Sequence, residues 1–356
     1  MPNPSGVDSL VPKLNVLIKG NRLPMETVGD LLSVTVSEDL DIPAMFTLEL
    51  VNWNLVKSQI TWADSELFDI GNTVEVQMGY GNSLKTLIVG EITGLEPEFS
   101  QTATPILVVR GHDLRHRLLR GSKTRSFTQM KDSAIASKIA GEQGISCKVK
   151  DTSIKLEYIL QANQTDLEFL QQRAKRIGYE VTVEGKTLYF RSHQNNTQKV
   201  LTLNRSDDLI EFSPRLSTMS QVGQVEVHTW DVKQKKALVG KAGAGDETTT
   251  MKGGTSGPKN TNRAFGKASH VIINEPVLSQ AEAEQIAKGQ YNDMALAYIT
   301  GEGMCHGNPE FRVGYTIEIT GLGKRFSGLY YLTSVTHIYS EDLGYRTEFS
   351  VRRNAA

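Results

Sequence analysis

A short stretch near residue 70 recurs near residue 315, and this internal repeat limits the possible folds more than any other feature of the chain. The segment FDIGNTVEV (68–76) aligns with FRVGYTIEI (311–319) at an offset of 243 residues, with Phe, Gly, Thr and Glu in common. The same offset, without a gap, pairs Thr93 with Thr336, Ile92 with Val335, Thr104 with Thr347, Val108 with Val351 and Arg110 with Arg353. Chance similarity between two strands rich in Val, Gly and Thr is the alternative, but the constant offset favours duplication of one β domain. Three chains with two copies each would present six similar units around an axis.

The first third of the chain has the pattern of short β-strands. Apolar and polar residues alternate in LLSVTVS (31–37), MFTLELV (45–51) and NTVEVQM (72–78), and glycine and asparagine separate the runs. Such alternation indicates strands with one buried face, and closely spaced turns without intervening helices favour an antiparallel barrel or sandwich. We therefore predict a first β domain over residues 1–112.

Residues 113–205 have a mixed pattern that predicts a small α/β domain. The segment 129–144 has apolar residues four apart and a terminal glycine, which indicates a short amphipathic helix. A second helix is predicted after Thr165, because Thr165 and Glu168 have the spacing of a capping box and Gly178 provides the stop. The following segment, YEVTVEGKTLYFRS, is typical of strands.

Residues 206–356 return to the strand pattern and predict a second β domain. The segment 240–267 is rich in Gly, Thr, Lys and Asn, so we expect a long mobile loop there that serves as a contact arm. A helix is predicted near 279–298, where Ser279 and Glu282 form another capping box. The expected fold class is mainly β with an α+β insertion: two antiparallel β domains plus the small α/β domain.

Composition excludes several classes of protein. The 356 residues include 39 Lys and Arg against 40 Asp and Glu, so the basic excess of a nucleic-acid-binding protein is missing. No run approaches the roughly 18 apolar residues of a membrane span, and the amino-terminal residues 1–16 lack the pattern of a signal peptide. We expect cytoplasmic synthesis and assembly. Cys147 and Cys305 have no metal-site spacing, and buried reduced thiols are the expectation.

Three segments in the expected order resemble one known family. QANQTDLEFLQQRAKRIGYEV (161–181) is similar to the helix "Q..ETD..FL.RLA...G" of phage late control D proteins, which are tail hubs of contractile phages, and of the hub half of VgrG spikes. RGHDLRHRL (110–118) and the terminal segment 311–353 support the match. Gln164 stands where the family often has Glu, and the segment 240–267 has no family motif.

The resemblance implies a homotrimer in which two tube-protein-like barrels per chain make a pseudo-sixfold ring. Such a hub connects a hexameric inner tube protein to a trimeric spike, within a baseplate of a phage tail, bacteriocin or contractile injection system. VgrG chains continue into a needle, whereas this sequence stops at Ala356, so we expect the spike to be a separate chain. Tape measure or cargo are further expected partners. No cofactor is implied.

No motif for catalysis, cofactor or metal was found, and we predict a structural protein and not an enzyme. His112 and His116 are four apart, but no helix is secure there; the surrounding Arg110, Arg115, Arg117 and Arg120 suggest an interface or solvated surface whose acidic partners lie on a neighbouring chain. GGTSGPKN (253–260) lacks the ending of a phosphate loop and is not expected to lead into a helix.

Two other functions remain open. Glu96 and Glu98 belong to the acid pairs that a tail-associated cell-wall hydrolase would need, although sequence spacing cannot establish a cleft. A carbohydrate-binding module for host attachment is the other. The aromatic residues Phe326, Tyr330, Tyr331 and Tyr339 are expected to pack barrel faces, with some at subunit contacts.

Overall fold

The computed structural model describes residues 11–193, 195, 198–231 and 234–356. The expectation about the amino-terminal residues 1–10 lies outside this part of the chain. The protein is mainly β with a small number of helices, which confirms the expected fold class; the number of barrels stays a prediction. Within the described residues no helix is long and apolar enough to cross a bilayer.

The first sheet unit is antiparallel and has the strand order β3-β4-β9-β8-β7-β1. Alternating burial explains it: Val34 and Val36 of β3 are fully buried, and the residues between them face outward. The elements are β1 (Pro12–Ile18), β2 (Asn21–Arg22), α1 (Met25–Gly29), β3 (Leu31–Asp39), β4 (Met45–Val51), β5 (Trp53–Asn54), β6 (Gln59–Ile60), the 3-10 helix η2 (Glu66–Phe68), β7 (Thr73–Tyr80), β8 (Ser83–Glu98) and β9 (Ile106–Asp113).

The α/β region follows β9 and has its own apolar core. Its elements are the 3-10 helix η3 (Leu114–Leu119), β10 (Lys123–Met130), α2 (Asp132–Glu142), β11 (Ser146–Val149), β12 (Leu156–Gln164), α3 (Asp166–Arg176), β13 (Tyr179–Glu184) and β14 (Thr187–Ser192). The predicted capping box of α3 is confirmed: the Glu168 amide donates to Thr165 Oγ1 at 3.2 Å, and the Thr165 amide donates to Glu168 Oε2 at 2.8 Å. Gly178, at φ +69°, ends the helix.

The second sheet unit repeats the strand order of the first. It runs β16-β20-β23-β22-β21-β15, although β15 and β21 are parallel where β1 and β7 are antiparallel. Its elements are β15 (Leu201–Asn204), β16 (Leu209–Leu216), β20 (Ile299–His306), β21 (Thr316–Thr320), α6 (Gly323–Phe326), β22 (Gly328–Ser340) and β23 (Gly344–Arg353). Six strands of one unit therefore have counterparts in the other.

The repeated motif forms the same turn in both units. Phe68 and Phe311 are both fully buried, and the offset of 243 residues continues through the start of the next strand, where Thr73 corresponds to Thr316. Beyond it the offset changes. The Gly71 amide donates to Ile92 O, whereas the Gly314 amide donates to Leu332 O, so Ile92 corresponds to Leu332 at an offset of 240.

This change of offset corrects the ungapped alignment. Val108 and Val351 are not equivalent, because Val108 is partly exposed and Val351 is buried. In the corrected register Val109 corresponds to Phe349 and Asp113 to Arg353, and all four side chains are buried. The matches of Thr93, Ile92, Thr104 and Arg110 at an offset of 243 are wrong for the same reason: a shift of three residues moves a strand residue to the other face.

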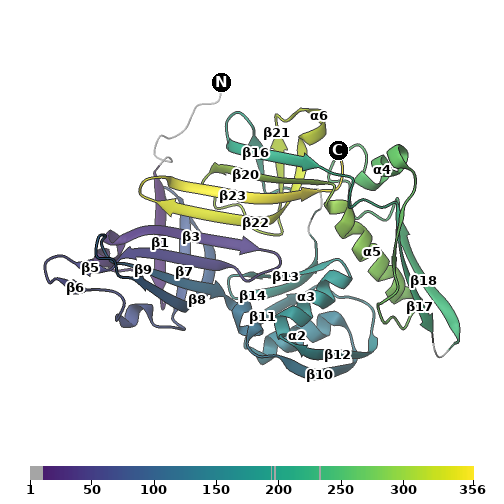
Figure 1. Cartoon of the computed structure of the whole chain (residues 1–356), viewed down its shortest axis with the longest axis horizontal. Helices are drawn as coiled ribbons and strands as arrows, with labels where there is room; N and C mark the ends of the chain where they lie inside the picture. The colour runs from purple at the N-terminus through teal and green to yellow at the C-terminus, as the bar shows by residue number, and fades with distance from the viewer. Residues whose placement is uncertain (1–10, 194, 196–197, 232–233) are drawn as a thin grey trace.

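An insertion between β16 and β20 contains β17 (Gln224–Asp231), β18 (Lys236–Gly243), α4 (Gly257–Phe265), β19 (Ser269–Ile272) and α5 (Gln280–Leu296). The strands form a three-stranded sheet that packs on α5 (Figure 1). The prediction of a mobile loop over 240–267 is wrong, because this segment includes the end of β18, the fully buried Met251 and all of α4. The expectation that GGTSGPKN does not lead into a helix is wrong for the same reason.

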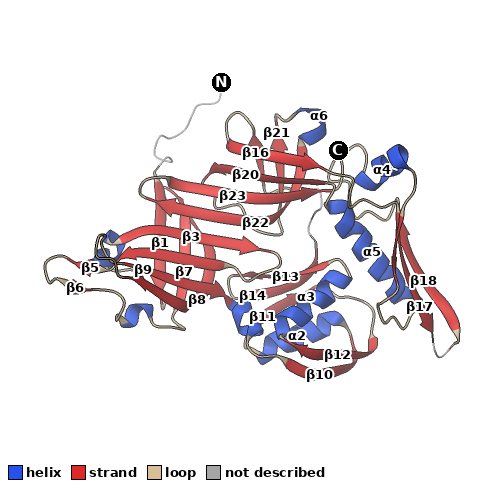
Figure 2. Cartoon of the chain, viewed as in Figure 1, coloured by secondary structure: helices blue, strands red, loops and turns tan. Residues whose placement is uncertain are grey.

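The two sheet units share one continuous sheet, because β22 of the second unit pairs with β3 of the first (Figure 2). The α/β region lies against one end of this sheet, and α5 lies beside the α/β region (Figure 1). Arg176 of α3 links them: its Nε donates to Glu275 Oε2 at 2.7 Å and its Nη1 to Glu282 Oε1 at 2.8 Å.

Candidate functional site

The junction between the two sheet units is the first candidate site. Strands β22 and β3 pair antiparallel from Ser334 opposite Asp39 to Ser340 opposite Ser33. On one face the Thr336 hydroxyl bonds to the Ser37 hydroxyl at 3.3 Å. On the other face Tyr339 packs against the core of the first unit. The junction is therefore a packed interface as well as a hydrogen-bonded one.

His337 is the buried polar residue of this junction. Phe311 O can only accept a hydrogen bond, so His337 Nε2, 3.1 Å away, carries the proton. The Nδ1 atom then accepts from the Tyr345 hydroxyl at 2.9 Å and the Thr347 hydroxyl at 3.2 Å. Burial lowers the pKa of His337 to about 3, with a smaller contribution from the Arg312 charge and an opposing one from the bond to Phe311. The ring is neutral and fully bonded near neutral pH.

A buried ion pair connects the repeated motif to the junction. Arg312 Nη2 lies 2.6 Å from Glu38 Oε1, and the Val313 amide donates to Glu38 Oε2 at 3.2 Å. Burial raises the pKa of Glu38, while the Arg312 charge and the Val313 hydrogen bond oppose that rise. Because a buried charge without a partner is costly, this pair favours one orientation of the two units.

The outward face of the shared sheet is polar and continuous across the junction. Two open hollows of about 390 and 420 Å³ lie on it and share Ser213, Glu302 and Ser350. Further along the same face Ser33 donates to Glu49 at 2.9 Å. Hydroxyl and carboxylate side chains cover this face, so it suits contact with water or with a polar surface more than with an apolar ligand.

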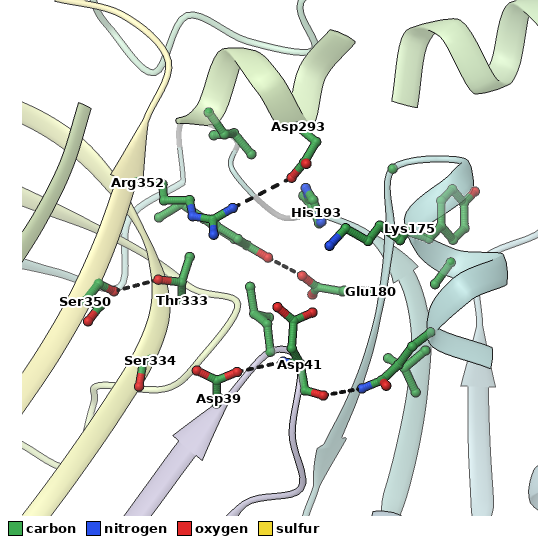
Figure 3. A pocket seen from close by; sticks show the side chains of 18 residues that line it. Asp39, Asp41, Lys175, Glu180, His193, Asp293, Thr333, Ser334, Ser350 and Arg352 are labelled. Atoms are coloured by element: carbon green, nitrogen blue, oxygen red, sulfur yellow. Dashed lines mark hydrogen bonds and ion pairs between the residues drawn. The ribbon is translucent and has the colours of Figure 1, made fainter. Parts of the chain in front are cut away.

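A pocket of about 300 Å³ lies where the sheet, the α/β region and α5 meet (Figure 3). Its wall contains the ion pair between Arg352 and Asp293 at 3.7 Å and the hydrogen bond from Tyr331 to Glu180. Asp39 and Asp41 of the first sheet unit and Lys175 of α3 also line it (Figure 3). The pocket is a polar seam between three parts of the chain.

The two histidines of interest for metal binding do not share a helix face. His112 lies in β9, where its Nδ1 bonds to the Thr93 hydroxyl at 2.8 Å, and His116 lies in η3, where its Nε2 bonds to Glu91 at 2.8 Å. Burial, then the charge of His116, lowers the pKa of His112.

The basic cluster has acidic partners within its own chain, which corrects the expectation that they lie on a neighbouring chain. Arg110 bonds to Glu96 at 2.8 Å, Arg115 to Asp113 at 2.9 Å, and Arg117 to Glu91 at 3.0 Å. The bond from Arg117, the largest effect, lowers the pKa of Glu91. Arg120 is exposed.

The aromatic and cysteine expectations have mixed outcomes. Packing of Tyr330, Tyr331, Phe326 and Tyr339 against sheet faces is confirmed: the two adjacent tyrosines are fully buried, and the other two pack against the cores of the second and first units. Of the thiols, Cys305 is buried, which raises its pKa to about 12, whereas Cys147 is only partly buried. The expectation of burial is therefore wrong for Cys147.

Sequence reasoning missed the junction itself. Its two strands lie almost 300 residues apart, for example Thr336 and Ser37, so no local pattern could pair them. The repeat was the one available signal, because it indicated two similar units in one chain.

Comparisons with known proteins concern the whole chain. The family model described as the Alg8 N-terminal domain matches residues 8–341. No curated protein matches the sequence. Among solved structures, the 43 kDa tail protein of prophage MuSo2 from Shewanella oneidensis is similar with a TM-score of 0.71 at 16% identity, over 96% of this chain and 98% of that chain.

Two further structures show the same likeness. A tail protein from Neisseria meningitidis MC58 has a TM-score of 0.69 at 16% identity, over 96% of this chain and 97% of that chain. A component of the type VI secretion system of E. coli has a TM-score of 0.62 at 14% identity, over 96% of this chain and 77% of that chain. At these identities the likeness concerns the fold, which is that of phage tail proteins.

Proposed function

We propose that this chain, which belongs to the family described as the Alg8 N-terminal domain, is a structural subunit of the tail or baseplate of a phage-tail-like particle. In this role three copies form a ring of six sheet units that joins an inner tube to a separate spike. The fold shared with phage tail proteins supports the tail role. The resemblance to late control D hubs supports the ring.

One observation carries the ring proposal. The two sheet units have the same strand order and are joined edge to edge through β22 and β3 in one sheet. Neighbouring units of a closed ring are related in such a way, because each offers one edge to the unit before it and another to the unit after it. A chain with two units then needs only a third of the ring.

The placement of the non-repeated parts suggests which partner meets which end of the ring. The α/β region leaves the first unit after Asp113, and the insertion leaves the second unit after Leu216. These are the same end, because Arg353, the counterpart of Asp113, and Leu216 both lie opposite Ile299. That end repeats three times per ring and suits a trimeric spike, whereas the other end is closer to sixfold symmetry and suits the tube.

In this proposal assembly is the mechanism and the chain performs no catalysis. The exposed Glu96 is bonded to Arg110, so it is held in a sheet ladder and not across a cleft from Glu98. The polar face of the shared sheet would line the ring opening.

Native mass measurement of the full chain, alone and mixed with purified tube and spike proteins, tests the proposal. We expect a trimer and a larger complex with each partner. A chain that stays monomeric at micromolar concentration and binds neither protein would overturn it.

A further inference from the structure

The junction within the chain has a missing counterpart. The β3 edge of the first unit is covered by the outer half of β22, whereas β16, which takes the place of β3 in the second unit, is the end strand of the sheet. Likewise the outer half of β8, residues 92–98, pairs with β9 alone among the described strands. The chain therefore has one free edge of each kind that meets at β22 and β3.

The corrected repeat fixes how these edges correspond. Thr35, Thr47 and Arg110 form one row across the first unit, and Ser213, Glu302 and Ser350 form the equivalent row across the second. Ile338 of β22 lies opposite Thr35. At the offset of 240 its counterpart is Glu98 of β8, which is thereby matched to Ser213.

We infer that β16 of one copy pairs antiparallel with the outer half of β8 from a second copy, with Glu98 opposite Ser213. This inference rests on the proposed ring and deepens it by naming the contact between copies. The pairs on the core-facing side are then all apolar: Leu95 with Leu216, Pro97 with Pro214, and Phe99 with Phe212.

The exposed Phe99 is the strongest observation for this contact. Its side chain is 64% exposed, which is unusual for a phenyl ring at the end of a strand. Its counterpart Tyr339 packs across the junction within the chain on the core of the first unit. In the inferred contact Phe99 reaches Phe212, which already packs with Tyr330 and Phe349 of the second unit.

The outward face of the inferred contact has complementary charge. Glu96 lies opposite Arg215 in the same register, and both residues are exposed in the single chain. An opposite-charge pair directly across two strands is favourable, whereas like charges there are not. Glu96 can bond to Arg215 of the neighbour while it keeps Arg110 of its own chain.

The two prolines explain why these free edges do not pair at random. Pro97 and Pro214 lack the amide hydrogen, and proline on an edge strand is a common protection against unwanted strand addition. Opposite one another they contribute no N–H to the ladder, so this one pair is held by side-chain packing and the hydrogen bonds on either side.

Disulfide trapping tests the register. Residues directly opposite in adjacent strands have Cβ atoms about 4.5–5.5 Å apart, which suits a disulfide. In a Cys147→Ser background, the full chain with Glu98→Cys and Ser213→Cys should give covalent trimers on mild oxidation. A link within one chain is excluded, since six strands separate β16 from β8 in the shared sheet.

The matched control combines Glu98→Cys with Glu211→Cys, two residues away on the same face, and should give at least tenfold less covalent trimer. Equal trapping of both pairs, or none in a chain that is trimeric by native mass, would overturn the inferred register while the proposed function stands. A chain that is monomeric and ignores tube and spike proteins would overturn both. Charge reversal gives a second measurement: Arg215→Glu should weaken the trimer, and adding Glu96→Arg should restore it.

Discussion

Gly71 and Gly314 have the same left-handed backbone and donate the same hydrogen bond, although they belong to different sheet units. Their φ angles are +89° and +81°, and their amides donate to Ile92 O at 2.8 Å and Leu332 O at 2.9 Å. The bond closes the turn that leads into β7 in one unit and β21 in the other. This turn is therefore a feature of the repeated unit and not of either half alone.

The two glycines should respond differently to alanine. A Cβ at Gly71 meets no atom within 4 Å, so Gly71→Ala should cost only the left-handed strain of about 1–2 kcal/mol. A Cβ at Gly314 comes within 3.1 Å of Glu180 Oε1 and 3.2 Å of Arg191 Nη2, so Gly314→Ala should cost more. Denaturant unfolding at one fixed protein concentration compares the two. Equal losses would show that the Glu180–Arg191 pair yields without cost.

His337 predicts a specific acid sensitivity of the junction. Its pKa is about 3 in the folded chain against an ordinary value of 6.5, so between these values the unfolded chain binds a proton that the folded chain does not. Stability from this group is complete above pH 6.5 and is lost as the pH falls toward 3, by up to about 1.4 kcal/mol per pH unit.

The matched variant is His337→Gln, whose amide cannot titrate. Unfolding free energies of the two proteins should converge as the pH falls from 6.5 to 3 and should run parallel above 7, since the other titrating groups are common to both. Parallel curves over the whole range would contradict the buried neutral imidazole.

The parts of the fold that depend on neighbouring residues could be predicted from the sequence. The α3 helix is one, because Thr165 and Glu168 cap it through bonds only three residues apart. The repeated turn is another, since Phe68, Gly71 and their counterparts recur as a motif. Local chemistry determines such features, so local patterns reveal them.

The failures have a common physical cause in contacts between distant residues. Helix α4 lies in a segment of loop-like composition, but Gly257 packs directly against the Tyr298 ring and Asn260 bonds to its hydroxyl at 3.3 Å. The offset changes after the first repeated strand because the β8 and β22 ladders contain irregularities, near Gly94 and Ser334. The candidate site depends on such contacts as well, and composition does not record them.

Phe99 offers a test of assembly that is separate from folding. Phe99→Asp should increase the dissociation constant of the trimer at least tenfold, because it places a charge against Phe212 of the neighbouring copy. Stability of the single chain should change little, since the ring is already exposed. Sedimentation over a range of concentrations measures the first and denaturant unfolding the second.

The control for Phe99 is Phe265→Asp in α4, where the phenyl ring is 76% exposed and plays no part in the inferred contact. It should leave the trimer unchanged. Comparable weakening by both substitutions would point to general charge repulsion and would argue against a contact at Phe99.

Gly289 of α5 tests how the insertion is held to the α/β region. A Cβ at Gly289 would lie 2.6 Å from the backbone nitrogen of Gly178, so Gly289→Ala must separate α5 from the end of α3 and strain the ion pairs of Arg176. We expect a loss of about 1–3 kcal/mol from this overpacking. Gly141→Ala in α2 is the control, because its Cβ meets no atom within 4 Å and alanine favours a helix by up to about 1 kcal/mol over glycine. Denaturant unfolding should therefore give changes of opposite sign, and hydrogen exchange should rise in α5 only for Gly289→Ala. If both alanines stabilise the chain, α5 does not depend on this close approach for its position.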